Sequence, residues 1–183
     1  MMDIMSKGFR KIGYLINTIL SKMIYKGLSV NGIFRKRHDT QIIISDNGKM
    51  NLGRNVLFQR NVSISSIGGE LIIGDNVSFN RNCILISRNK IVIGDNVIFG
   101  PGVTVYDHDH VFSEKGILPG YNHGAVIIDK DCWIAANVTI LRNTHIGQGS
   151  VVGAGAVVKG EIPPHSLVTN DRTLKIVPIE TRT

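Results

Sequence analysis

The sequence predicts an all-β solenoid built from three-sided coils, and a strict hexad period is the first observation behind this. From residue 128 to residue 158 an aliphatic residue occupies every sixth position: Ile128, Ile134, Ile140, Ile146, Val152 and Val158. A period of six fits neither the helical period nor simple strand alternation. Smaller side chains stand two positions before each of these, where strand alternation also turns them inward: Val126, Cys132, Val138, Thr144, Ser150 and Ala156. The chain is therefore expected to turn a corner every six residues.

The same rule extends toward the N-terminus and defines the coils. It gives the sets Leu52, Phe58, Ile64; Ile73, Phe79, Leu85; and Ile93, Phe99, Val105. Three six-residue faces make an eighteen-residue triangular coil, and extra residues fall only between sets, so every insertion should leave the same corner. Coils stacked at a strand spacing of about 4.8 Å would pair their backbone groups. An antiparallel β-sandwich is the alternative, but its turns need not keep a fixed period.

The N-terminal segment differs in composition from the rest. Residues 1–40 carry eight basic and two acidic side chains, a local charge of +6 out of the +7 of the whole chain. Residues 4–28 show helical spacing, with apolar residues on one side. We expect this apolar stripe to pack on the solenoid or on a neighbouring subunit. A basic amphipathic helix lying on an anionic membrane surface is the other interpretation. Nucleic-acid binding is not expected, because no platform of stacking aromatic residues accompanies the basic ones.

Length and composition predict one compact domain with appendages. The expected division is a basic amphipathic segment at 1–40, a β-helix domain at 41–165 with a loop at 106–124, and a C-terminal tail at 166–183. Cys83 and Cys132 both stand two positions before a core aliphatic residue, so we interpret them as buried, reduced fillers. No stretch resembles a cleavable secretory signal and no apolar run reaches membrane-spanning length, so a cytoplasmic protein is expected.

Several motifs carry a specific resemblance. The stretches IGDNV, CWIAANVTI and IGQGSVVGAGAVVKGEIPP resemble the hexapeptide-repeat acyltransferases over roughly residues 50 to 165. Within them the chain looks most like the maltose/galactoside O-acetyltransferase branch and the bacterial polysaccharide O-acetyltransferases. The resemblance implies a left-handed parallel β-helix with triangular coils, a homotrimer with three sites at subunit junctions, and acetyl-CoA as co-substrate.

The long insertion is the expected place for catalysis. It contains His108, His110 and His123, and an imidazole is well suited to accept a hydroxyl proton near neutral pH. By resemblance the catalytic base is His108, with His110 as its rival, and Asn80 is the residue that meets the acceptor. His123 is a lesser candidate. Asp107 or Asp109 could orient an imidazole, but a solvated loop carboxylate is the more common outcome.

The donor residues are also assigned by resemblance. Trp133, Ala136 and Ala154 correspond to family positions along the pantetheine arm of coenzyme A. The nearest cations for its phosphates are Lys159, Arg172 and Lys175. The chain departs from the family here, because Lys159 stands one place early and residues 168–175 lack the usual turn after the prolines.

The expected function is acetyl transfer from acetyl-CoA to a sugar hydroxyl of a bacterial surface polysaccharide or its precursor, directly and with His108 as general base. No metal is expected. The alternatives are a nucleotide-sugar N-acetyltransferase, a zinc lyase resembling the γ-class carbonic anhydrases that would use His108, His110 and His123, and a scaffold without catalysis. The location is expected to be cytoplasmic, with peripheral contact at the inner membrane face if the N-terminal helix binds lipid.

Overall fold

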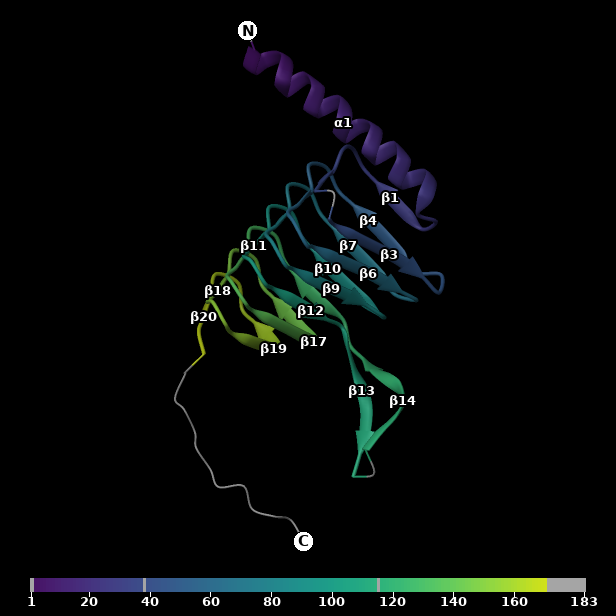
Figure 1. Cartoon of the computed structure of the whole chain (residues 1–183). Helices are drawn as coiled ribbons and strands as arrows, with labels where there is room; N and C mark the ends of the chain where they lie inside the picture. Colours follow the sequence, from purple (N-terminus) through teal and green to yellow (C-terminus); the bar gives the residue numbers. More distant parts are fainter. Residues whose placement is uncertain (1, 38, 115, 171–183) are drawn as a thin grey trace.

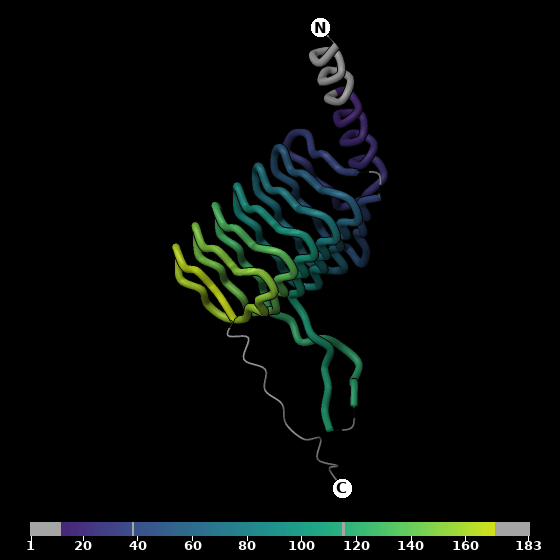
Figure 2. The backbone as a smooth tube through the Cα atoms, turned by 60° about the vertical axis from the view of Figure 1, so that its left-hand side comes forward, coloured from purple at the N-terminus to yellow at the C-terminus, as the bar shows by residue number. Residues whose placement is uncertain are grey.

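The computed structural model consists of one helix, a three-sided β-prism and a projecting hairpin (Figures 1 and 2). It describes residues 2–37, 39–114 and 116–170, and the side chains of α1 (Met2–Ile24) only from residue 12 onward. The hairpin is formed by β13 (His108–Ser113) and β14 (Gly116–His123).

The remaining strands, as far as the chain is described, form two parallel sheets that wrap the prism. The larger runs in the order β1 (Leu28–Val30), β4 (Lys49–Leu52), β7 (Glu70–Ile73), β10 (Lys90–Ile93), β15 (Val126–Ile128), β17 (Thr139–Ile146), β12 (Thr104–Tyr106), β9 (Ile84–Ser87), β6 (Ser63–Ile67) and β3 (Gln41–Ser45), with β19 (Val157–Ile162) on β17. The seven-stranded sheet runs β2 (Arg35–Lys36), β5 (Leu57–Phe58), β8 (Ser78–Phe79), β11 (Ile98–Phe99), β16 (Trp133–Ile134), β18 (Val151–Val152) and β20 (Leu167–Val168).

The larger sheet covers two faces of the prism, because β17 continues through a corner. Thr139 and Ile140 pair with β12 on one face, and residues 144–146 pair with β15 on the next. The seven-stranded sheet is the third face. The predicted parallel β-helix of triangular coils is therefore confirmed. The hairpin leaves the corner between β12 and β15, which is the corner where the other connections between six-residue sets also lie.

The prism begins earlier and ends later than the hexad pattern indicates. Strand β1 already pairs with β4, and β2 pairs with β5, so residues 28–36 form part of a coil inside the range assigned to the helical segment. The pattern missed this coil because Lys36 stands in register with Phe58, where an apolar residue was expected. At the other end β20 pairs with β18, which carries the prism to Val168.

The core is a continuous column of buried side chains. Phe58, Phe79 and Phe99 occupy equivalent places in successive coils, with ring centroids 5.2 and 4.6 Å apart and nearly parallel planes. Phe34 lies edge-on to Phe58 at 6.2 Å and closes the column. Cys83 and Cys132 are buried free thiols, which confirms their interpretation as fillers.

The two IGDN sequences and the equivalent LGRN sequence at 52–55 form one corner of the prism. Asn55, Asn76 and Asn96 adopt a positive φ near 60°, which asparagine tolerates better than most residues. Their amides form a ladder along the prism, with N···O distances of 3.0 Å between Asn55 and Asn76 and 3.2 Å between Asn76 and Asn96. The neighbouring glycine allows close approach, because a Cβ on Gly94 would lie 2.5 Å from the backbone nitrogen of Lys130.

Helix α1 packs on the prism through its polar side. Thr18 and Ser21 are buried, whereas the apolar side chains are exposed: Ile12, Leu15, Ile16, Ile19, Leu20, Met23 and Ile24. The expectation that the apolar stripe packs on the chain's own solenoid is therefore wrong for these residues. A small polar face fits against the first coil because the Thr18 hydroxyl can accept the backbone N–H of Phe34.

Among the residues that the structure describes, no helix is long and apolar enough to cross a membrane.

His145 links three coils on the outer surface of the larger sheet. Its Nε2 lies 3.1 Å from Asp129 Oδ2 and its Nδ1 lies 3.0 Å from Glu161 Oε2. The hydrogen bond to Asp129 is the main cause that raises the pKa of His145 above its usual 6.5. The protonated ring, with two N–H donors, is the form that satisfies both carboxylates.

We expect Phe79→Ala to destabilise the fold by about 3–5 kcal/mol, because it opens a cavity and breaks two ring contacts in the core column. Phe112→Ala, on the exposed hairpin, is the matched control and should change stability by less than about 0.5 kcal/mol. Urea unfolding followed by circular dichroism measures both. Equal losses in the two variants would contradict the importance of the column.

His145→Gln should lower stability at acidic pH but not at alkaline pH. A histidine with a raised folded-state pKa contributes stability that is fully present below the unfolded pKa of 6.5 and lost as pH rises through the folded value. The ring is 39% exposed, so solvent screening limits the difference to about 0.5 kcal/mol. Unfolding midpoints of both proteins compared near pH 5.5 and pH 9 give the measurement, and a pH-independent difference would refute this account.

Candidate active site

The histidine cluster is positioned by the hairpin that leaves the corner after β12. His108 is the first residue of β13 and pairs with His123, and His110 pairs with Tyr121. The backbone N–H of Gly124 donates to the carbonyl oxygen of Asp107 at 2.9 Å, which fixes the base of the hairpin on the prism. His108 therefore lies on the rigid part of the hairpin, next to the coil.

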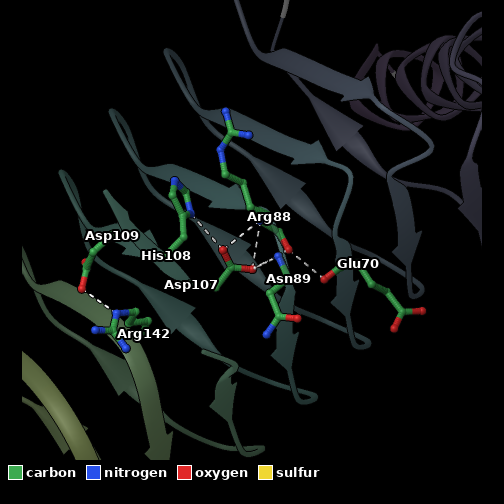
Figure 3. A network of polar contacts seen from close by, with 8 residues as sticks. Glu70, Arg88, Asn89, Asp107, His108, Asp109 and Arg142 are labelled. Carbon is green, nitrogen blue, oxygen red and sulfur yellow. Dashed lines mark hydrogen bonds and ion pairs between the residues drawn. The ribbon is translucent and has the colours of Figure 1, made fainter. Parts of the chain in front are cut away.

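Asp107 is a buried carboxylate that receives several hydrogen bonds. The Ser87 hydroxyl donates to Oδ2 at 2.8 Å, the backbone N–H of Asn89 donates to Oδ2 at 2.8 Å, and that of Arg88 donates to Oδ1 at 2.8 Å. These donors form the turn between β9 and β10, one coil below (Figure 3). The carboxylate is fully buried, so the turn holds it in one place.

The same carboxylate orients His108. Asp107 Oδ1 lies 2.9 Å from His108 Nδ1, and the imidazole is only 11% exposed. A carboxylate can only accept, so we assign the proton to Nδ1, which leaves the lone pair on Nε2. This is the arrangement that a general base needs. The sequence left the choice between Asp107 and Asp109 open and favoured a solvated carboxylate, and for Asp107 that expectation is wrong.

Aromatic rings and an arginine surround the imidazole. Tyr106 and Tyr121 meet His108 edge-on, with centroids 6.3 and 5.2 Å from its ring. The Arg88 guanidinium lies 4.1 Å from the centroid of Tyr121. The turn between β9 and β10 thus contacts the site in two ways: its backbone N–H groups bind Asp107, and the Arg88 side chain contacts Tyr121. No sequence motif indicated the second contact.

An open cavity of about 680 Å³ lies beside His108. Its lining is aromatic and aliphatic with a few polar groups: Ile86, Tyr106, His108, Asp109, His110, Phe112 and Ile117. This mixture of apolar walls and a few polar groups is typical of small-molecule sites.

His110 and Asp109 occupy the outer part of this cavity. His110 is exposed, and its ring lies 4.8 Å from that of Tyr121. Asp109 pairs with Arg142 Nε on β17 at 2.6 Å, so its carboxylate points away from His108 (Figure 3). His123 is also exposed. Of the three imidazoles, His108 is the one that has the buried carboxylate partner described above.

Four of the other predicted site residues lie on or beside the seven-stranded sheet: Trp133, Ala136, Ala154 and Asn80. Trp133 is half-exposed and in register with Ile98 and Val151. Ala136 and Ala154 occupy the adjoining corner, where Gly155 N–H donates to the Ala136 carbonyl oxygen at 2.8 Å. Asn80 lies at the same corner, in the turn after β8. Lys159 is exposed on β19, whereas Arg172 and Lys175 lie outside the described residues.

Within one chain these residues do not meet His108. The corner that carries His108 joins the two faces of the larger sheet, and Trp133 is on the third face, opposite to that corner. Asn80 lies in a different, smaller hollow from His108. A site that uses both sets of residues therefore needs the His108 corner of one chain and the seven-stranded face of another.

The cysteines do not provide a nucleophile, because burial raises the pKa of the Cys83 thiol to about 11 and also raises that of Cys132. In the parts of the chain described by the structure, no group of three or more His, Cys, Asp or Glu side chains is arranged to hold a metal ion.

Comparison with known proteins gives the family. Residues 125–160 match the model of the bacterial transferase hexapeptide (six repeats). The chain is 31% identical over 136 residues to "Putative lipopolysaccharide biosynthesis O-acetyl transferase WbbJ" of Escherichia coli K12, a match that covers 68% of this chain and 69% of WbbJ. The chain belongs to the hexapeptide-repeat acyltransferases.

Several other relatives are matched over a smaller share of their length. The galactoside O-acetyltransferase of E. coli K12 is 32% identical over 104 residues, which covers 55% of this chain and 50% of the enzyme. The chain spans about half the length of several such curated relatives, 49% for one from Schizosaccharomyces pombe. Among solved structures, the N-acyltransferase AntD of Bacillus cereus shares the fold, with a TM-score of 0.66 and 21% identity over 82% of each chain.

In this protein, Asp107→Asn should change which nitrogen of His108 carries the proton. The Ser87 hydroxyl and the Asn89 N–H, which donate to Oδ2, would keep the amide oxygen there, so the amide NH₂ would face Nδ1 and move the imidazole proton to Nε2. Nitrogen-15 NMR of labelled histidine distinguishes the two tautomers, and Asp109→Asn is the control that should leave the His108 signals in place. An Asp107→Asn protein that folds normally and keeps Nδ1 protonated would show that this carboxylate does not orient the base.

Proposed function

We propose that the protein is an acetyl-CoA-dependent O-acetyltransferase that acts on a sugar hydroxyl of a bacterial surface polysaccharide or its precursor. The observation that carries the proposal is the Asp107–His108 pair, in which a buried carboxylate orients an imidazole at the edge of an open cavity. Membership in the hexapeptide-repeat acyltransferases supports the reaction class.

The proton path follows from the geometry. His108 Nε2 accepts the proton of the acceptor hydroxyl while the oxygen forms a bond to the thioester carbonyl carbon. Asp107 stabilises the imidazolium that results, because its carboxylate stays on Nδ1–H at 2.9 Å. When the carbon–sulfur bond breaks, the imidazolium returns the proton to the departing thiolate, so the base is regenerated and no covalent enzyme intermediate is needed.

The seven-stranded face and its corner fit the pantetheine arm of the donor. The thioester of acetyl-CoA supplies the activated acyl group. Trp133 offers a half-exposed ring beside Ile98 and Val151, and Ala136 and Ala154 leave the neighbouring backbone accessible because their side chains are small. Lys159, proposed for the phosphates, is exposed on β19 between the two faces of the larger sheet, so it would reach the donor from the chain that supplies His108. Asn80, on the same corner, would hold the acceptor hydroxyl or the developing oxyanion.

The proposed active unit is a homotrimer with three sites at subunit junctions. The support is that one chain separates His108 from Trp133 and Asn80 by the width of the prism, so a second chain must complete the site. We also propose that the protein works in the cytoplasm, where acetyl-CoA is made, and contacts the inner membrane face through α1.

The acceptor class is supported by the names of relatives. WbbJ is named as a lipopolysaccharide O-acetyl transferase and the E. coli relative as a galactoside O-acetyltransferase. AntD was solved with dTDP-4-amino-4,6-dideoxyglucose and coenzyme A. An amine acceptor is therefore the competing case, and product analysis with matched hydroxy and amino sugars separates the two.

Replacing His108 by Gln should reduce acetyl transfer by roughly 10²- to 10⁴-fold, because general-base catalysis is removed. Acetyl-CoA binding, measured by calorimetry, should stay within about threefold, because the contacts to the pantetheine arm are assigned to other residues, Trp133, Ala136 and Ala154. His110→Gln is the matched control and should retain most activity. Should the His108 variant turn over normally, or His110→Gln be the inactive one, the assignment of the base is wrong.

A further inference from the structure

Helix α1 packs on the prism through its polar side and leaves its apolar side exposed. An amphipathic helix on a globular protein normally buries its apolar stripe. Here Thr18 and Ser21 are each only 3% exposed and face the first coil. The Thr18 hydroxyl donates to the Tyr14 carbonyl oxygen at 2.8 Å and accepts the backbone N–H of Phe34 at 3.4 Å. The polar side is thus already occupied by the prism.

The opposite side forms a continuous apolar surface, which we call the outer face of α1. It consists of Ile12, Leu15, Ile16, Ile19, Leu20, Met23 and Ile24, with exposures from 45% to 78%. Single exposed apolar residues are common on proteins, but seven on one face of one helix mark an interaction site. Among the described residues, no part of the prism covers it.

Charge indicates what covers this face. Lys22 and Lys26 are exposed in the last turn of the helix and just after it, and Lys22 Nζ is 3.5 Å from the Val30 carbonyl oxygen. Arg37, in the first coil, is exposed too. In sequence, residues 1–40 hold a net +6 while the other 143 residues hold only +1. Apolar residues beside a concentrated positive charge are the combination that binds anionic lipid interfaces.

We propose that the outer face of α1 binds an anionic phospholipid surface, with the helix lying in the plane of the lipid headgroups. This inference rests on the membrane contact proposed above and specifies the residues of α1 that make it and the anionic lipid that they bind. The lysines would meet the headgroups while the aliphatic side chains enter the acyl boundary.

The arrangement of the molecule is compatible with this orientation. The hairpin that carries His108 projects from the side of the prism away from α1 in both views (Figures 1 and 2). A chain bound through α1 therefore leaves its candidate active site facing the aqueous phase. In a trimer, three helices would bind one surface together and raise the avidity well above that of a single helix.

The test is co-sedimentation of the full chain with vesicles. The wild type should bind phosphatidylcholine vesicles that contain phosphatidylglycerol at least tenfold more tightly than pure phosphatidylcholine vesicles. The triple variant Ile16→Ser, Ile19→Ser, Met23→Ser should lose about 100-fold in binding. The double variant Lys22→Gln, Lys26→Gln should weaken binding to the anionic vesicles about tenfold and make it less sensitive to salt.

The matched control is Ile43→Ser with Val157→Ser, which removes two exposed aliphatic side chains from the larger sheet and should leave vesicle binding unchanged. Thermal unfolding verifies that each variant is folded. Equal binding by wild type and triple variant would overturn the proposal. So would a wild type that ignores vesicles while the triple variant changes the molar mass in light scattering, because the outer face would then belong to a second copy. Acetyl transfer to a soluble acceptor, measured without lipid, tests the proposed function separately and should be unaffected by the triple variant.

Discussion

Backbone pairing between successive coils is the interaction on which the rest of the structure depends. Adjacent coils exchange N–H···O=C hydrogen bonds in both directions: the Arg35 N–H donates to the Val56 carbonyl oxygen of the next coil, and the Asn55 N–H donates back to the Ile33 carbonyl oxygen. A parallel ladder of this kind fixes the register of every residue along the prism axis. The phenylalanine column, the asparagine ladder and the His145 bridge all follow, because each needs equivalent residues in adjacent coils to lie directly above one another.

The candidate site is a product of the same register. Asp107 is held by a turn that precedes it by nearly twenty residues in sequence but lies one coil below it in space. Its three donors come from a corner whose backbone N–H groups would otherwise lack partners. The site therefore obtains its precision from the scaffold, which holds Asp107 at the base of the hairpin beside His108, and the outer part of the hairpin contributes the cavity wall.

A feature of the fold or of the site could be predicted from the sequence only where residues close together in the chain determine it. The hexad period predicted the coils from Leu52 to Val158, because one aliphatic residue per face is a strong and repeated signal. It missed the first coil, where Lys36 interrupts the pattern and Phe34 fills the space instead. The burial of Asp107 was not predictable from its neighbours, since the donors lie in another coil. The expected packing of α1 on its own prism was wrong for a similar reason: the helical pattern identifies an apolar stripe but does not say which side meets the prism.

The connections of variable length leave the prism at one corner. The residues that shape the cavity wall are therefore separate from those that pair the coils. Residues can be added or lost between β12 and β15 without shifting the pairing of any coil, because the chain returns to the prism one step further along. The wall of the cavity beside His108 can thus diverge between relatives while Asp107 and the seven-stranded face stay where they are. Such a molecule is free to change what that cavity admits through substitutions that leave its folding almost untouched.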